Sequence, residues 1–249
     1  MQSVIPAEEK EVTYTEFLPC EALRSFIYCY WELKSPPRNT PFCYRVVADG
    51  CIDLFFECDN PQASSVMGYC NTYVEFPIMG AFHYIGVRFL PSVFPLLFGQ
   101  DAFEISAQEI PLREVVPALA TFITQQLEIP LSLAIITQRL DNYFLRHLSQ
   151  RPLQMDNRFF SALLQILQSR GSIHISQLDT GISPRQLRRL FDYYIGDSPK
   201  AFSNIVRFQH ILSTKAYHNH SFLDTYYDQA HFIKSFKTFY GDTPSKVLG

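Results

Sequence analysis

Hydrophobic and polar positions follow two different periods along this chain. From residue 12 to about residue 110, short apolar and aromatic runs alternate with turn signals, a pattern typical of β-strands. From Leu112 onward, apolar residues recur at helical spacing instead. The pattern predicts an α+β chain, with a small β-barrel or sandwich and its helices first and an all-α region after it.

Several segments of the first part predict strands. They are Phe26–Leu33, Cys51–Glu57, Ser65–Gly68, Tyr73–Phe76 and His83–Phe89. Asp49-Gly50 is a turn signal between the run that begins at Arg45 and the next strand, so these two are expected to form a hairpin. Asp49 and Gly50 are therefore interpreted as turn residues rather than ligand contacts.

Three helices are expected in the middle of the chain, at Val115–Leu127, Leu131–Leu148 and Arg158–Arg170. The second carries an apolar stripe, which consists of Leu133, Ile136, Leu140, Phe144 and His147. The stripe has two interpretations: it pairs two subunits, or it packs on the barrel of its own chain. Arg151-Pro152 is the predicted hinge between residues 1–150 and residues 151–249, the two expected domains.

One pattern occurs twice in the C-terminal part, at an offset of 45 residues. The first copy runs from Ser183 to Pro199 and the second from Asp228 to Pro244. Each copy reads as a short helix, with an N-cap at Ser183 or Asp228 and a terminating glycine at its end. Self-similarity at a fixed offset indicates one structural unit used twice.

The repeated helices leave basic and amide side chains on their polar faces. Arginine and glutamine can bond guanine and adenine bidentately in the DNA major groove. Residues 1–149 carry 9 Lys and Arg against 17 Asp and Glu, or −8, whereas residues 150–249 carry 12 against 7, or +5. The basic half suits phosphate attraction, while the alternative for any single helix is an ordinary solvated face.

The segment from about Ile173 to Leu248 resembles the DNA-binding domain of the AraC/XylS family of transcription regulators. The resemblance rests on Ile182-Ser-Pro-Arg-Gln-Leu187, Gly196-Asp-Ser-Pro-Lys200, Tyr227-Asp-Gln-Ala-His-Phe232 and Gly241-Asp-Thr-Pro-Ser245. It implies two helix-turn-helix units joined by a linker helix, with double-stranded DNA as the partner. It also implies that the helix at Leu131–Leu148 pairs two subunits, which is the interpretation of its stripe that we favour. By motif position, the DNA-facing residues are Arg185, Gln186, Arg188, Arg189, Gln229, Ala230, Ile233 and Lys234.

This chain departs from the family pattern before each recognition helix. Ile175–Gly181 is about two residues shorter than the family's supporting segment, and His218–Thr225 is about four residues shorter, roughly one helical turn. We therefore expect the second unit to be distorted or frayed, with specific DNA binding weakened or confined to the first unit.

The first part resembles the half-cupin-like sensor domains that often precede such DNA-binding domains. Ala48–Phe56, Gly86–Pro91 and Ile105–Leu112 carry this resemblance, which covers about Phe17 to Val116. A small organic effector is expected among Trp31, Tyr44, Phe55, Tyr84 and Phe89, oriented by Arg88 or Asp53. The alternative is that these aromatic side chains only fill the interior. His83 is the one histidine before residue 147, so no metal-binding cupin site and no cofactor are expected.

Other function classes receive little support from the sequence. All six cysteines lie in the first 70 residues without a Cys-x-x-Cys pair, which predicts reduced thiols and leaves a redox pair as the alternative. A thiol enzyme would need Cys51 or Cys58 beside His83 and Asp53. The N-terminus lacks signal-peptide character and no apolar run approaches the roughly 18 residues of a membrane span, so we expect a cytoplasmic protein.

The sequence therefore predicts a DNA-binding transcription regulator without enzyme activity, which responds to an unidentified small effector and pairs as a homodimer. The alternative is a degenerate relative that acts through protein–protein contacts, with weak or no specific DNA binding. Its support is the two shortened supporting segments.

Overall fold

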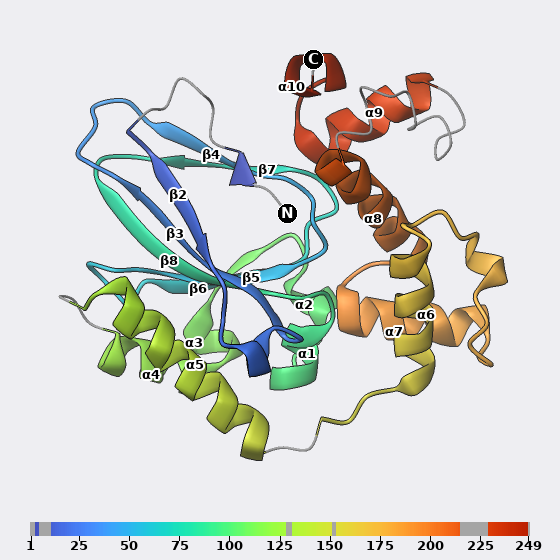
Figure 1. Cartoon of the computed structure of the whole chain (residues 1–249), viewed down its shortest axis with the longest axis horizontal. Coiled ribbons are helices and arrows are strands. Elements are labelled where there is room, and N and C mark those ends of the chain that lie inside the picture. Colours follow the sequence, from blue (N-terminus) through green and yellow to red (C-terminus); the bar gives the residue numbers. More distant parts are fainter. Residues whose placement is uncertain (1–2, 5–10, 128–130, 151–152, 215–228, 249) are drawn as a thin grey trace.

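Two unlike parts follow one another along the chain (Figure 1). The computed structural model describes residues 3–4, 11–127, 131–150, 153–214 and 229–248. Strands and a few helices fill the N-terminal part, and within these described ranges only helices follow residue 112. This confirms the expected α+β class and the order of the two parts.

Antiparallel strands form two sheets in the N-terminal part. Strands β2 (Thr13–Phe17), β3 (Ile27–Ser35), β8 (Phe82–Phe89), β5 (Ile52–Glu57), β6 (Ser64–Met67) and β9 (Glu109–Pro111) make the larger sheet, in that order. Strands β1 (Ser3–Val4), β4 (Phe42–Val46) and β7 (Val74–Ile78) make the smaller one. The predicted strands are thus present, but the expected hairpin is wrong. The Asp49-Gly50 turn carries the chain from β4 in one sheet to β5 in the other, because each strand finds its partners elsewhere.

The larger sheet has two apolar faces. On β5, Leu54 and Phe56 point to one face while Asp53 and Phe55 point to the other, as the period of two requires. An irregularity between Ile27 and Cys29 shifts the register of β3, so Ile27 reaches the first face and Cys29 the second.

Helices cover the first face of this sheet, and the smaller sheet covers the second. The covering helices are α1 (Val93–Phe98), α2 (Ala102–Ile105), α3 (Leu112–Val115), α4 (Pro117–Gln126) and α5 (Leu133–Gln150). In Figure 1, α4 and α5 lie side by side along the lower edge of the sheet. One apolar core joins these helices to β3, β5 and β8.

The apolar stripe of α5 packs on its own chain. Ile136, Leu140 and Phe144 are buried in the core under the large sheet. The carboxylate of Asp141 accepts hydrogen bonds from the Tyr30 hydroxyl at 2.8 Å and from the backbone N–H of Cys20. The favoured use of this stripe for dimerisation is therefore wrong, because the sheet already buries it. Homodimerisation stays a prediction without a surface assigned to it.

The C-terminal part consists of helices around a second core. They are α6 (Asn157–Gln168), α7 (Pro184–Ile195), α8 (Pro199–Thr214), α9 (Gln229–Tyr240) and α10 (Pro244–Leu248). Their core is rich in aromatic residues and includes Phe159, Phe191, Phe208 and Phe236. Among the described residues, every helix falls short of the length and apolar character that a membrane crossing needs.

The internal repeat is present in the backbone. The first residues of α7 and α9 are 45 positions apart, and so are their last residues. The first residues of α8 and α10 are also 45 positions apart. Gly196 and Gly241 follow the two helices with φ values of +98° and +92°, the left-handed geometry that ends a helix and suits glycine. The predicted hinge at residues 151–152, the cap at Asp228 and the shortened segment at His218–Thr225 lie outside the described residues.

Candidate ligand cavity and nucleic-acid interface

A cavity of about 350 Å³ lies between the two sheets of the N-terminal part. The larger sheet contributes residues of β3, β5, β6, β8 and β9, and the smaller sheet contributes residues of β4 and β7. The walls consist mainly of apolar side chains, with a few charged groups among them. Such a composition is typical of small-molecule sites, in which polar groups orient an apolar ligand.

Aromatic side chains form one wall over the middle of the sheet. Gly86 pairs with Trp31 on one side and with Phe55 on the other. A Cβ atom at Gly86 would lie 2.1 Å from the indole of Trp31, so the missing side chain makes room for this ring. The ring centroids of Trp31 and Phe55 are 6.2 Å apart. Those of Phe55 and Tyr84 are also 6.2 Å apart, in an edge-to-face arrangement.

Charged groups gather around Arg88, which borders the cavity together with Asp53. Nε of Arg88 donates to both carboxylate oxygens of Asp53, at 3.0 and 3.1 Å, and Nε1 of Trp31 donates to Asp53 at 3.0 Å. Asp49 lies 3.4 Å from Nε of Arg88, and Glu16 lies 4.0 Å from its Nη1. Two nearby aspartates raise the pKa of Arg88 against the opposing effect of burial.

One donor of this cluster is left over. Arg88 is 2% exposed, and its Nη1 has no hydrogen-bond partner within the part of the chain that the structure describes. A buried donor without a partner costs free energy, and a ligand acceptor would recover it.

Six of the seven residues that the sequence proposed as effector contacts border this cavity: Trp31, Tyr44, Asp53, Phe55, Tyr84 and Arg88. Phe89, proposed as a seventh, is wrong for the cavity because it is buried on the opposite face of β8, in the core under the helices. The sequence interpretation missed Phe76, Glu109 and the charge role of Asp49. Strand alternation could have indicated Phe76, whereas Asp49 resembled a turn residue and gave no such signal.

The two cysteines considered for a thiol enzyme, Cys51 and Cys58, are unlike reactive thiols. All six cysteines are free. Burial raises the pKa of the Cys51 thiol well above its usual value and that of Cys58 to about 12, so neither forms a thiolate readily. The ring of His83 bonds the carboxylate of Glu32 at 2.8 Å. The described residues contain no group of three His, Cys, Asp or Glu side chains arranged to hold a metal ion.

Helix α7 presents a basic face to solvent. Arg185, Arg188 and Arg189 are exposed, while Leu187 and Phe191 on the other face are buried. Ser183 caps the helix, and the Gln186 side-chain oxygen accepts from the Ser183 backbone N–H at 3.2 Å in a capping box. A base contact by Gln186 would therefore compete with the cap.

Helix α9 presents the corresponding face of the second copy. Gln229, Ala230, Ile233 and Lys234 are all exposed, and Phe232, Phe236 and Phe239 are buried behind them. Ile233 is a large apolar side chain with 38% of its surface exposed. An exposed apolar residue among polar ones suits contact with a thymine methyl group.

The C-terminal half of α7 rests on the N-terminal part. The Ser106 hydroxyl donates to the carbonyl of Gly196 at 3.1 Å, and Arg189 borders a surface hollow with Asp101 and Phe103 of α2. Before α7, the predicted supporting helix is only a short 3₁₀ turn at Ile175–Gln177. The shortening of this segment relative to the family pattern stays a prediction.

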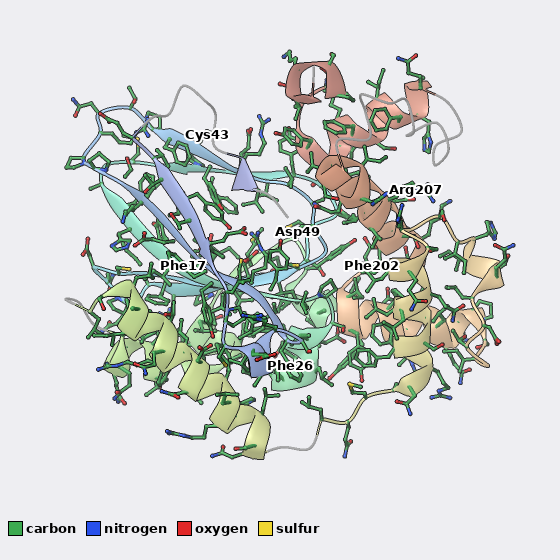
Figure 2. The ribbon with its side chains drawn as sticks, in the orientation of Figure 1. Phe17, Phe26, Cys43, Asp49, Phe202 and Arg207 are labelled. Carbon is green, nitrogen blue, oxygen red and sulfur yellow. The ribbon has the colours of Figure 1, made fainter. Side chains whose placement is uncertain are left out.

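The loop at residues 47–51 joins the cavity to the C-terminal helices. Figure 2 shows Asp49 between the sheets and α8. Asp49 pairs with Arg88, while the Ala48 carbonyl accepts from Gln209 of α8 at 2.6 Å and the Ala48 N–H donates to the Phe239 carbonyl of α9 at 3.1 Å. Phe202 of α8 packs against Gly50. One loop therefore contacts Arg88 of the cavity wall, helix α8 and helix α9.

Comparisons with known proteins identify two similarities. Residues 15–111 match the family model described as "Domain of unknown function (DUF6597)", which spans less than half of the chain. Among solved structures, the chain is similar to ToxT from Vibrio cholerae O395, with 9% sequence identity, 96% of this chain and 97% of that chain covered, and a TM-score of 0.41. This degree of similarity carries no conclusion about activity. No curated protein matches the sequence.

Proposed function

We propose that this protein is a DNA-binding transcription regulator whose N-terminal cavity receives a small effector. The observation that carries the proposal is the repeat, in which α7 and α9 have the same length, the same glycine terminator and an exposed polar face. The resemblance of the sequence to AraC/XylS DNA-binding domains supports the same interpretation. In this proposal Arg185, Arg188 and Arg189 contact DNA from α7, and Gln229, Ala230, Ile233 and Lys234 contact it from α9.

The route from effector to DNA follows the loop at residues 47–51. An effector that contacts Arg88 changes the surroundings of Asp49, and Ala48 in the same loop is bonded to α8 and α9. Effector binding then shifts the balance between two placements of the repeated helices. The sign of the response, activation or repression, does not enter this proposal.

The first test is a triple substitution on α7. Changing Arg185, Arg188 and Arg189 to alanine removes three exposed positive charges, so DNA affinity should fall strongly. The slope of log K against log salt should drop by up to about three, since each lost phosphate contact removes about 0.9. Anisotropy titrations across salt, on fragments selected from random and genomic DNA, measure both quantities.

The matched control changes Arg24, Arg113 and Arg146 to alanine. These arginines are also exposed but belong to the N-terminal part, so net charge changes equally while the repeat stays intact. If both triple variants lose affinity to the same extent, the assignment of α7 as a recognition helix is wrong.

A second candidate is a protein-binding descendant of such regulators. The observation that favours it is the single 3₁₀ turn that supports α7, together with the contact between α7 and α2. The fragment selection separates the two candidates. A recovered sequence motif supports the regulator, whereas weak binding without a motif, removed by salt, supports the descendant.

A further inference from the structure

The surroundings of Arg88 are unusual because acids outnumber bases around this buried guanidinium. Asp53 and Asp49 lie within 3.4 Å of Nε of Arg88, and Glu16 approaches its Nη1 to 4.0 Å. A fourth carboxylate, that of Glu109, borders the same cavity. One positive charge thus faces several negative ones, and those of Asp49 and Asp53 lie in buried surroundings where charges are poorly screened.

This imbalance disfavours an anionic ligand. A ligand carboxylate would bring a further negative charge beside Asp49, Asp53 and Glu16, although Arg88 alone suggests an acid-binding site. A ligand ammonium would suit the carboxylates, but it would leave Nη1 of Arg88 without an acceptor and place two cations together.

The cavity therefore favours a ligand with an uncharged polar group that both accepts and donates hydrogen bonds. Nη1 of Arg88 needs an acceptor, and Asp53 and Glu109, which border the cavity, carry carboxylate oxygens that can accept from a ligand donor. A primary amide supplies both groups without charge. The aromatic wall of Trp31, Phe55 and Tyr84, closed by Phe76 from the smaller sheet, needs an apolar body of moderate size.

We propose that the cavity binds uncharged apolar molecules whose polar head carries both a hydrogen-bond acceptor and a donor, as an amide does, and that it rejects carboxylates. The proposal rests on the effector site of the proposed function and specifies its ligand class. The acceptor of the ligand takes the Nη1 proton of Arg88. Its donor faces the carboxylates, and its body lies against Trp31.

Trp31 makes the test direct, because it is the one tryptophan of the chain and lies in the cavity wall. Its emission is titrated with three probes that share one body and do not absorb in this range: 4-cyclohexylbutanamide, 4-cyclohexylbutyrate and 4-cyclohexylbutylamine. The amide should bind at least about tenfold more tightly than either charged probe, as expected when a buried polar group loses its partner. Equal or tighter binding of the carboxylate or the amine overturns the proposal. So does unchanged emission with all three probes at millimolar concentration.

Two variants test the reason for the selectivity. Glu16→Gln removes a negative charge near Nη1 of Arg88. It should reduce the ratio of amide affinity to carboxylate affinity severalfold. Glu21→Gln is the matched control, since Glu21 is an exposed acid of the same part of the chain, whereas Glu16 is the one that approaches Arg88. If Glu16→Gln leaves this ratio of affinities unchanged, the explanation by charge is wrong.

Arg88→Lys keeps the charge but removes Nη1, so it should weaken amide binding about tenfold. If this variant does not fold, Glu16→Gln still decides the question. These titrations contain no DNA, so their outcome is independent of whether α7 and α9 bind it. Loss of DNA binding with intact amide selectivity would reject the regulator and keep the ligand class.

Discussion

At the residue scale, Gly86 and Arg88 decide what the cavity can be. Gly86 leaves space for the indole of Trp31, and Arg88 two positions later reaches the same face of β8. A side chain at Gly86 would push Trp31 into the cavity, and an apolar residue at Arg88 would leave Asp53 buried without its cation.

Gly86→Ala should therefore destabilise the protein more than an ordinary glycine substitution. The new methyl group would lie 2.1 Å from the Trp31 ring, and overpacking of this kind costs about 1–3 kcal/mol or more. Gly80→Ala serves as the control, because nothing lies within 4 Å of its Cβ position and only its φ of +70° is strained. Chemical denaturation followed by Trp31 emission measures both variants. Equal losses would mean that the contact with the indole at Gly86 costs no more than the backbone strain at Gly80.

At the element scale, the two repeated helices are bounded by residues near their own ends. Ser183, Pro184, Gln186 and Gly196 form the start and stop of α7, so this helix does not depend on distant contacts for its limits. Its direction in space depends on α1 and α2, against which its C-terminal half rests.

Gln186→Ala separates the cap of α7 from its recognition surface. The Gln186 side-chain oxygen bonds the Ser183 backbone N–H, so its loss should lower the free energy of unfolding by about 0.5–1 kcal/mol. DNA affinity should fall less than in Arg185→Ala, whose side chain is exposed and outside the capping box. Urea denaturation and anisotropy measure the two effects. A larger loss of DNA affinity in Gln186→Ala would assign base contact to Gln186 instead.

At the scale of the whole molecule, the two parts share contacts that go beyond a linker. Val47, Ala48 and Tyr69 from the N-terminal part belong to the apolar core of the C-terminal helices. Asn71 donates to Asp197 at 3.0 Å, and Gln209 donates to the Ala48 carbonyl at 2.6 Å. The division into residues 1–150 and 151–249 stays a prediction, since this core draws on both segments.

We expect the described parts to unfold together in one calorimetric transition. The double variant Asn71→Ala with Gln209→Ala removes two side-chain hydrogen bonds between the parts, for a loss of about 1–3 kcal/mol, and should broaden or split the transition. Gln165→Ala is the control, because its bond to the Asp179 carbonyl lies inside the C-terminal part. A split transition in the wild-type protein would contradict the coupling that effector response requires.

The sequence by itself determined what depends on near neighbours. Caps, terminating glycines and hydrophobic periods act within a few residues, so strand segments and both repeated helices could be predicted from them. Six of the seven proposed effector contacts border the cavity, because the alternation along β3, β5 and β8 places their side chains on one face.

Only the tertiary structure decided which distant segments meet. β4 and β5 belong to different sheets, and the apolar stripe of α5 is buried by its own chain. Asp49, which the sequence indicated as a turn residue, also pairs with Arg88. Each of these results depends on contacts between segments far apart in sequence, whose free energy comes from shared burial and from pairing of charges in the folded chain. A local pattern contains no information about which of several apolar surfaces will cover another, so these features follow from the folded chain alone.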